Sequence, residues 1–493
     1  MAEPTPRESP ANPLLHRNWL LVAGLIIMAG SLFSFLMLFV MHGMKGGSNA
    51  YVGILTFFVA PAFLFLGLGL AVFGVWWRRR QILRAGGPAP RLQFDLSMAR
   101  DRRVVLVGVG GLLGFLLISA LGSYQTYHFT ESTVFCGQAC HQVMEPEMTA
   151  YQSGPHARVS CTECHIGPGA EWFVKSKLSG SYQVYATLAN KYPRPIPTPI
   201  KDLRPAQETC EQCHWPAKFV GNTDRLYTYY LGDETNTVHH LRLLLKVGGA
   251  DPTHGPVGGI HWHMNVGHIV EYVPADDSRM VIPYVRLTDL QGKVTEFHLP
   301  GYTNRVDMSR LRRMDCVDCH NRPAHIFKAP NDAVNLAMAL GQIDPGLPWI
   351  KTNALYILTQ NYASTAEATN RIAQFIRGKY PGHPRAEAAV AALQEIYRRN
   401  FFPQMKVNWR AYPNHIGHKD WPGCTRCHDD KHVSTDGRKK IVFKDCSICH
   451  IILAQGDGEK LLQLNARGQP FEHPGDEIPS GYQCHECHNG GPM

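Results

Sequence analysis

Residues 446–450 read Cys446-Ser447-Ile448-Cys449-His450, which is two cysteines separated by two residues and followed directly by a histidine. The same order of residue types recurs along the chain. Five further copies have the cysteine pairs Cys161 and Cys164, Cys210 and Cys213, Cys316 and Cys319, Cys424 and Cys427, and Cys484 and Cys487, followed by His165, His214, His320, His428 and His488. A seventh unit, the first in the chain, has one extra residue and consists of Cys136, Cys140 and His141. Numbered in chain order as motifs 1 to 7, these units account for all 14 cysteines.

The spacing within each motif has a chemical reason. Two thiols placed in this way can form thioether bonds to the vinyl groups of a haem, and the next residue, histidine, then lies under the ring and supplies an axial nitrogen to iron. Paired cysteines could instead form zinc ribbons or, outside the cytoplasm, disulfides. Neither alternative requires a histidine after every second cysteine. The sequence therefore predicts seven covalently bound c-type haems.

The remaining histidines are candidates for the opposite side of each iron. The chain has 25 histidines, and the motifs use fewer than a third of them. Haems with two histidine ligands would need about six more. We expect these distal ligands to be His156, His263, His325, His418, His432 and His473, with His239, His240, His254 and His415 as reserves. His261 and His268 cluster with His263. For any one of them the alternative is a surface or hydrogen-bonded side chain, and the pairing of distal histidines with irons stays open.

Motif 1 differs from the others in its surroundings as well as its spacing. Met144 lies three residues after His141. A thioether ligand would raise the reduction potential of an iron relative to two histidines, so Met144 is a candidate distal ligand of the first iron. The alternative is a methionine that fills a gap in the core.

The first quarter of the chain contains three long apolar stretches, at residues 19–41, 51–77 and 104–124, and none of them includes Asp, Glu, Lys or Arg. Each is long enough to cross a hydrocarbon layer of about 30 Å as a helix. Pro61 lies inside the second stretch and is expected to kink it, which membrane helices tolerate. The first stretch lacks a following cleavage site, so we expect it to be an anchor and not a signal peptide.

Basic residues predict how the chain is oriented in the membrane. The segment between the second and third stretches holds Arg78, Arg79, Arg80, Arg84, Arg91, Arg100, Arg102 and Arg103, whereas the segment between the first two holds only Lys45. The positive-inside rule then places the arginine-rich loop in the cytoplasm. Everything after residue 124 is expected on the periplasmic side of a bacterial inner membrane, where c-type haem is attached.

We expect a multihaem cytochrome c fold that is mainly α-helical and irregular, with a small β insertion and three N-terminal transmembrane helices. The predicted segments are a membrane anchor with a basic cytoplasmic loop (1–124), a module with haems 1–3 (125–220), a β-rich insertion (221–315), a segment with haem 4 and helices (316–402) and a C-terminal module with haems 5–7 (403–493). Strands are expected at 269–273, 281–288 and 294–299, and an amphipathic segment at 171–188. Ala389, Ala392, Leu393 and Ile396 recur at helical spacing.

The formal net charge of +9 would by itself suggest nucleic acid or anionic lipid as partner. The propionates of the haems would offset that charge, so no nucleic-acid partner is expected.

From residue 135 to 214 the chain resembles the NapC/NirT family of membrane-anchored quinol dehydrogenases. The resemblance rests on a haem motif soon after a membrane helix, with Met144 just behind it, on His156 nine residues before His165, and on Lys177 twelve residues after His165. It implies that Lys177 lies at a quinol site and that His156 is a distal ligand. Lys175, Glu171, Gln183 and Tyr182 lie in the same segment, where an ordinary surface role is the expectation.

The chain departs from the usual family pattern. Family members commonly have four haems and one membrane helix, and an acidic residue where this chain has Val184. The layout of the whole chain is similar to that of seven-haem inner-membrane cytochromes of the ImcH-like type. This resemblance implies electron transfer from menaquinol to periplasmic c-type cytochromes in anaerobic or extracellular respiration, an activity of the quinol:cytochrome c oxidoreductase type.

Two other functions fit the same motifs. One is a terminal reductase of a small oxyanion such as nitrite, which would need a haem with an open iron position. The other is a subunit of a larger respiratory complex with no quinol site of its own. Because the chain has enough histidines to fill every distal position, electron transfer is the favoured prediction.

Overall fold

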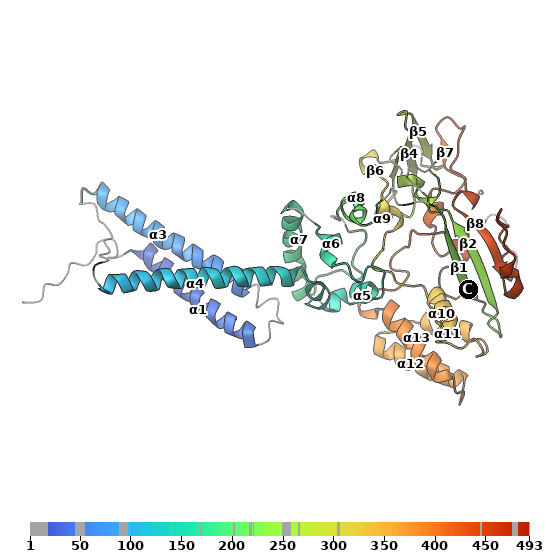
Figure 1. Cartoon of the computed structure of the whole chain (residues 1–493), viewed down its shortest axis with the longest axis horizontal. Coiled ribbons are helices and arrows are strands. Elements are labelled where there is room, and N and C mark those ends of the chain that lie inside the picture. Colours follow the sequence, from blue (N-terminus) through green and yellow to red (C-terminus); the bar gives the residue numbers. More distant parts are fainter. Residues whose placement is uncertain are drawn as a thin grey trace, which may run out of the picture. The chain divides into compact units, whose positions relative to one another are not determined.

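The computed structural model describes residues 18–44, 55–87, 97, 99–139, 141–167, 170–200, 203–215, 219, 221–248, 258–264, 267–302, 306–443, 446–475 and 482–492. The chain divides into two compact units, residues 1–140 and residues 141–493. Figure 1 shows that helices make up the first unit, whereas the second combines helices with two sheets.

Three helices of the first unit are long and apolar enough to cross a membrane. They are α1 (Trp19–Met44), α3 (Ala60–Arg84), which continues from the π-helical turn η1 (Leu55–Val59), and α4 (Ala99–Thr130). The prediction of three membrane helices is thereby confirmed. Pro61 lies in the first turn of α3, where a residue without an N–H is tolerated best. It therefore marks the start of this helix, directly after the π-helical turn.

Small residues bring α1 and α3 close together. A Cβ on Gly24 would lie only 2.6 Å from the backbone nitrogen of Ala71, so this contact requires glycine. Asn18 ties the start of α1 to α3, because its Nδ2 donates to the Gly74 oxygen (2.9 Å) while its Oδ1 accepts from the Leu21 nitrogen (3.1 Å). Such close packing with internally satisfied polar groups is typical of helices in lipid.

The arginines used for the orientation are partly described. Arg78, Arg79, Arg80 and Arg84 lie in the last turns of α3, and Arg102 and Arg103 lie near the start of α4. Lys45 and Arg91 lie outside the described residues.

The second unit starts with helices. They are α5 (His141–Gln152), α6 (Cys161–His165), α7 (Ala170–Leu188) and α8 (Ala206–Thr209). The amphipathic segment expected at residues 171–188 corresponds to α7.

Two antiparallel sheets follow. One has the order β1 (Thr223–Tyr230), β2 (Val238–Leu245) and β8 (His450–Gly456), and the other has the order β6 (Arg312–Arg313), β3 (Ile269–Val273), β4 (Tyr284–Thr288), β5 (Val294–His298) and β7 (Val433–Ser434). Strand β4 begins after Pro283, which cannot donate to the ladder, and not at residue 281. Strands β7 and β8 come from the C-terminal part of the chain, so both sheets join the predicted insertion to that part.

Four helices between motifs 4 and 5 form a core without motif residues. They are α10 (Pro330–Ala339), α11 (Ile350–Leu358), α12 (Thr365–Lys379) and α13 (Ala386–Asn400). Ala389 and Leu393, predicted at helical spacing, are fully buried in this core, while Ala392 and Ile396 pack at its edge. Figure 1 shows the four helices together on one side of the second unit.

Candidate haem sites

The six motifs with two intervening residues each fold as about one turn of helix. These turns are α6, η3 (Cys210–Gln212), α9 (Cys316–Cys319), η8 (Gly423–Arg426), η9 (Cys446–Ile448) and α14 (Cys484–Cys487). Residues three apart on such a turn project from one side. The two cysteines of a motif are therefore placed to reach the same ring, and the histidine follows at the end of the turn.

Six motif histidines each face a second histidine from another part of the chain. The ring centroids are 6.2 Å apart for His165 and His325, 6.0 Å for His214 and His156, 6.3 Å for His320 and His261, 5.9 Å for His428 and His263, 6.3 Å for His450 and His418, and 5.9 Å for His488 and His473.

These separations fit one metal between two rings. Two imidazoles on opposite faces of one iron, each at a metal–nitrogen distance of about 2 Å, have ring centroids about 6 Å apart. The angle between the ring planes varies from 4° for His261 and His320 to 90° for His263 and His428. A shared axis allows this, because each ring can rotate about its bond to the metal. The described residues therefore fit six haems with two histidine ligands each.

Five of the six distal histidines expected from the sequence occupy these positions, namely His156, His263, His325, His418 and His473. The structure does not bring His432 opposite a motif histidine. His432 is fully buried, its Nε2 lies 2.6 Å from the Ile282 oxygen, and its Nδ1 lies 2.9 Å from Asp429 Oδ1. Both of its ring nitrogens are thus engaged within the protein. The position opposite His320 is instead occupied by His261. In the sequence, the one feature that could have indicated this role is that His261 lies two residues before His263.

Among the reserve histidines that the structure describes, His240 and His415 have other contacts at Nδ1, whereas Nε2 of His239 and of His415 is buried without a hydrogen-bond partner among the described residues. Nδ1 of His240 lies 3.0 Å from Thr228 Oγ1, and Nδ1 of His415 lies 3.0 Å from the Asp318 oxygen. His268 stacks on Trp262 with ring centroids 3.8 Å apart. His254 lies outside the described residues.

Hydrogen bonds orient several of the paired rings. Their Nδ1 atoms contact backbone oxygens: His156 at 3.2 Å from Pro323, His261 at 2.8 Å from Val247, His263 at 2.9 Å from Ile260, His325 at 3.0 Å from Glu147 and His428 at 3.1 Å from Val442. A ring that donates from Nδ1 keeps Nε2 as the atom with a free lone pair. These contacts therefore select the tautomer that a metal ligand needs.

Burial also favours the neutral form of these rings. Desolvation is the largest cause that lowers the pKa of His263, to about 4, and it likewise lowers the pKa of His165, His320, His325, His418, His450 and His488. A histidine must be unprotonated to bind a metal. The surroundings thus keep these imidazoles ready to act as ligands at neutral pH.

Motif 1 is described only in part. Cys136 lies in the π-helical turn η2 (Phe135–Ala139), and Cys140 lies outside the described residues. The backbone of His141 begins α5, and Met144 follows three residues later on that helix, partly buried. Residues three apart on a helix share a face, which keeps Met144 a candidate for the first iron.

The quinol-site candidate Lys177 lies on α7 and is partly buried. On the same helix the side chains of Leu178, Tyr182 and Tyr185 are largely exposed, by 70%, 66% and 52%. Their spacing places them along one face of the helix. Lys175 has a different environment, because its Nζ lies 4.7 Å from the centroid of the Trp172 ring.

Comparison with known proteins identifies relatives of this chain. Residues 98–195 match the N-terminal region of the NapC/NirT cytochrome c family. The chain is 41% identical over 495 residues to the cytochrome c-type protein ImcH of Geobacter sulfurreducens, and the match covers 97% of this chain and 95% of that relative. No solved structure matches the chain.

Proposed function

Because the chain belongs to the ImcH-type, membrane-anchored multihaem cytochromes c with a NapC/NirT region, we propose that it oxidises menaquinol and passes the electrons to periplasmic c-type cytochromes. The observation that carries this proposal is the set of six histidine pairs, each spaced to fill both axial positions of one iron. Reduction of nitrite or a similar oxyanion needs an open iron position. Because a histidine pair would fill both axial positions of each of these six irons, the pairs favour electron transfer over oxyanion reduction.

In this proposal the motif cysteines hold seven haems by thioether bonds, and the six histidine pairs and His141 with Met144 ligate their irons. When bound, c-type haem supplies a one-electron iron couple. The protein's part is to hold the imidazoles neutral and oriented, through the Nδ1 contacts and the burial described above.

We assign the quinol site to α7. Quinol oxidation releases protons as well as electrons, so the site needs a polar group beside an apolar surface. The ammonium of Lys177 can donate a hydrogen bond to a quinol oxygen and stabilise the negative charge that develops as a proton leaves. Leu178, Tyr182 and Tyr185 supply apolar surface on the same helix.

The arginine-rich end of α3 supports the proposed orientation. With that end in the cytoplasm, the three membrane helices of an inner-membrane protein place residues 141–493 in the periplasm. That compartment is where c-type haem is attached and where soluble cytochromes could accept the electrons.

The test is reduction of the purified full-length protein by a soluble menaquinol analogue, followed in the haem absorption bands. We expect Lys177→Ala to slow this reduction by about 100-fold while dithionite still reduces the protein completely. The matched control is Lys175→Ala, which removes the same charge from the same helix and should reduce at the wild-type rate.

Two results would overturn the proposal. Wild-type protein that dithionite reduces but the quinol analogue does not would indicate a subunit without its own quinol site. A high-spin haem that binds nitrite, seen by electron paramagnetic resonance (EPR), would indicate an oxyanion reductase.

A further inference from the structure

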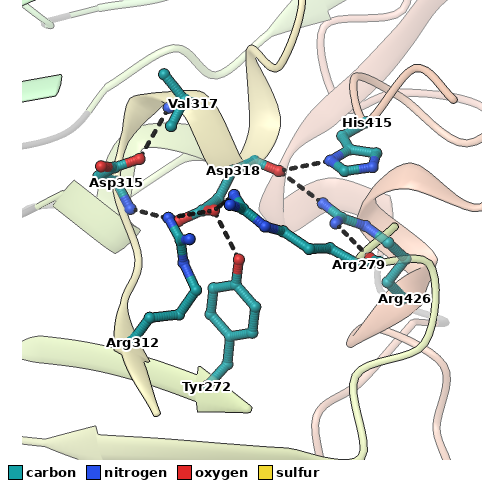
Figure 2. A network of polar contacts seen from close by, with 8 residues as sticks. All are labelled: Tyr272, Arg279, Arg312, Asp315, Val317, Asp318, His415 and Arg426. Atoms are coloured by element: carbon teal, nitrogen blue, oxygen red, sulfur yellow. Dashed lines mark hydrogen bonds and ion pairs between the residues drawn. The ribbon is translucent and has the colours of Figure 1, made fainter. Parts of the chain in front are cut away.

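Two attachment turns that are distant in sequence lie against each other. Motif 4 ends at His320 and motif 5 begins at Cys424, and the chain between them includes the helices α10 to α13. Figure 2 shows residues of both motifs in one polar network. Its centre is Asp318, which lies between the two cysteines of motif 4.

The carboxylate of Asp318 is almost completely buried, with 2% of the side chain exposed. Its Oδ1 accepts hydrogen bonds from the Tyr272 hydroxyl (2.6 Å) and from Nη1 of Arg279 (2.8 Å), and Nη2 of Arg312 lies 3.1 Å away. Its Oδ2 accepts from the Asp315 nitrogen (2.8 Å). Two guanidinium groups and two neutral donors thus compensate one buried charge, and they fix the turn of motif 4 to strands β3 and β6.

The backbone oxygen of Asp318 faces motif 5, where it accepts from Nη2 of Arg426 (2.9 Å) and from Nδ1 of His415 (3.0 Å) (Figure 2). Arg426 occupies the equivalent place between the cysteines of motif 5. Its Nη1 donates to the Arg279 oxygen (2.9 Å) and its Nε to the Gly423 oxygen (2.8 Å). One side chain therefore binds its own turn, the turn of motif 4 and the segment that carries Arg279.

The same two motifs are also joined on the distal side. His261 faces His320 of motif 4, and His263 faces His428 of motif 5. Both distal histidines lie on the single short helix η5 (Ile260–Met264). Because His261 and His263 are two residues apart on one short helical turn, the haem sites of motifs 4 and 5 cannot lie far from each other. This connection is independent of the Asp318 network.

We propose that Asp318 and Arg426 are positioning residues that hold the haem sites of motifs 4 and 5 as one rigid, closely coupled pair. The inference rests on the proposed haem attachment but not on quinol oxidation.

The two residues act in separable ways. Arg426 contributes mainly contacts between the turns, so its loss should change the distance between the sites. Asp318 also contributes a buried negative charge, which stabilises the oxidised, more positive state of nearby iron. Its neutral isostere should therefore raise reduction potentials while keeping most of the contacts.

The experiment uses the full-length protein with all haems attached, as checked by mass spectrometry. In Arg426→Gln, we expect the magnetic interaction between two low-spin haems in the EPR spectrum to weaken, and electron exchange between them after flash reduction to slow by about tenfold or more. In Asp318→Asn, we expect the potentials of two haems to shift upward in a spectroelectrochemical titration. Asp277→Asn is the matched control, because that carboxylate is 79% exposed and pairs with Arg310, and it should change neither readout.

Unchanged magnetic interaction and exchange in fully loaded Arg426→Gln would overturn the proposed coupling, and unchanged potentials in Asp318→Asn would overturn the role of the charge. Should Arg426→Gln fail to mature, Arg426→Lys keeps the charge and part of the bonding. An intermediate loss of coupling in that variant supports the proposal, and wild-type coupling contradicts it. None of these readouts requires quinol, so a failure of the proposed quinol site would be seen separately.

Discussion

Nδ1 of His325 lies 3.0 Å from the backbone oxygen of Glu147 and 3.2 Å from its Oε2. The same carboxylate pairs with Nη2 of Arg322 at 2.9 Å, and both side chains of that ion pair are mostly buried. Four other paired histidines have a described Nδ1 contact, and in each case the partner is a backbone oxygen. They are His156, His261, His263 and His428. A carboxylate behind a ligand imidazole makes the imidazole more basic, so in the proposed haem site Glu147 would favour the oxidised state of an iron held between His165 and His325.

We expect Glu147→Gln to raise the reduction potential of that one site, because the variant keeps the backbone contact but removes the negative charge. Spectroelectrochemical titration of the purified protein measures this shift. Glu145→Gln is the control, since Glu145 lies on the same helix and is exposed. Equal potentials in the two variants would contradict a role for Glu147 in setting the potential.

A second prediction separates His261 from His432. His261→Ala should convert one low-spin haem to a high-spin haem, because His320 would lose the ring that faces it. His432→Ala should keep every haem low-spin and instead lower the melting temperature, because it removes two buried hydrogen bonds. EPR spectra and thermal unfolding of both variants measure the two effects. A new high-spin signal in the His432 variant would show that the assignment of the two residues is reversed.

The third prediction concerns pH and stability. Lys351 is 2% exposed, and its Nζ donates to the Asn331 oxygen (2.9 Å) and to Asn335 Oδ1 (2.5 Å). Burial lowers the pKa of Lys351 to about 7, whereas an unfolded lysine has a pKa of about 10.4. Between these values the unfolded chain binds more protons, so this residue makes the free energy of unfolding rise with pH, by at most about 1.4 kcal/mol per unit.

Calorimetry between pH 7 and 9 checks this sign. The melting temperature of Lys351→Met relative to wild type should fall as the pH rises, because the variant lacks the group that gains stability in that window. Lys379→Met, in which an exposed lysine of α12 is replaced, should follow the wild-type pH dependence. Parallel curves for wild type and the Lys351 variant would mean that Lys351 does not titrate in this range.

The sequence was sufficient to predict the features that depend on local chemistry. Apolar composition alone indicates the three membrane helices, although α4 extends to Ala99 and Thr130 because polar residues can continue a helix beyond the hydrocarbon. The alternation of apolar and polar side chains indicates strands β3 to β5. The motif histidines follow from the cysteine spacing, because covalent attachment requires the histidine next to the second cysteine.

The features that depend on tertiary contacts could not be predicted from the sequence. His325 lies close to motif 4 in sequence, but the structure places it opposite His165 of motif 2. The sequence favoured His432 over His261, but in the structure His261 faces His320, whereas His432 contacts the Ile282 oxygen and Asp429. Similarly, β8 pairs with β2, although about half of the residues of the second unit lie between these strands in the sequence. Side-chain alternation does not specify such a pairing.

The order of the paired histidines along the chain has a consequence for the timing of assembly. Five of the six pairs draw their second histidine from a residue that precedes the motif, so in the proposed periplasmic orientation that histidine would be exported before the motif. His165 is the exception, because its partner His325 would be exported after motifs 3 and 4. The second site would thus gain both histidines only after the sites of motifs 3 and 4, although its own motif precedes theirs. A chain that stops before residue 325 would therefore leave the second site with His165 as its one paired histidine, even though motifs 2, 3 and 4 had all been made.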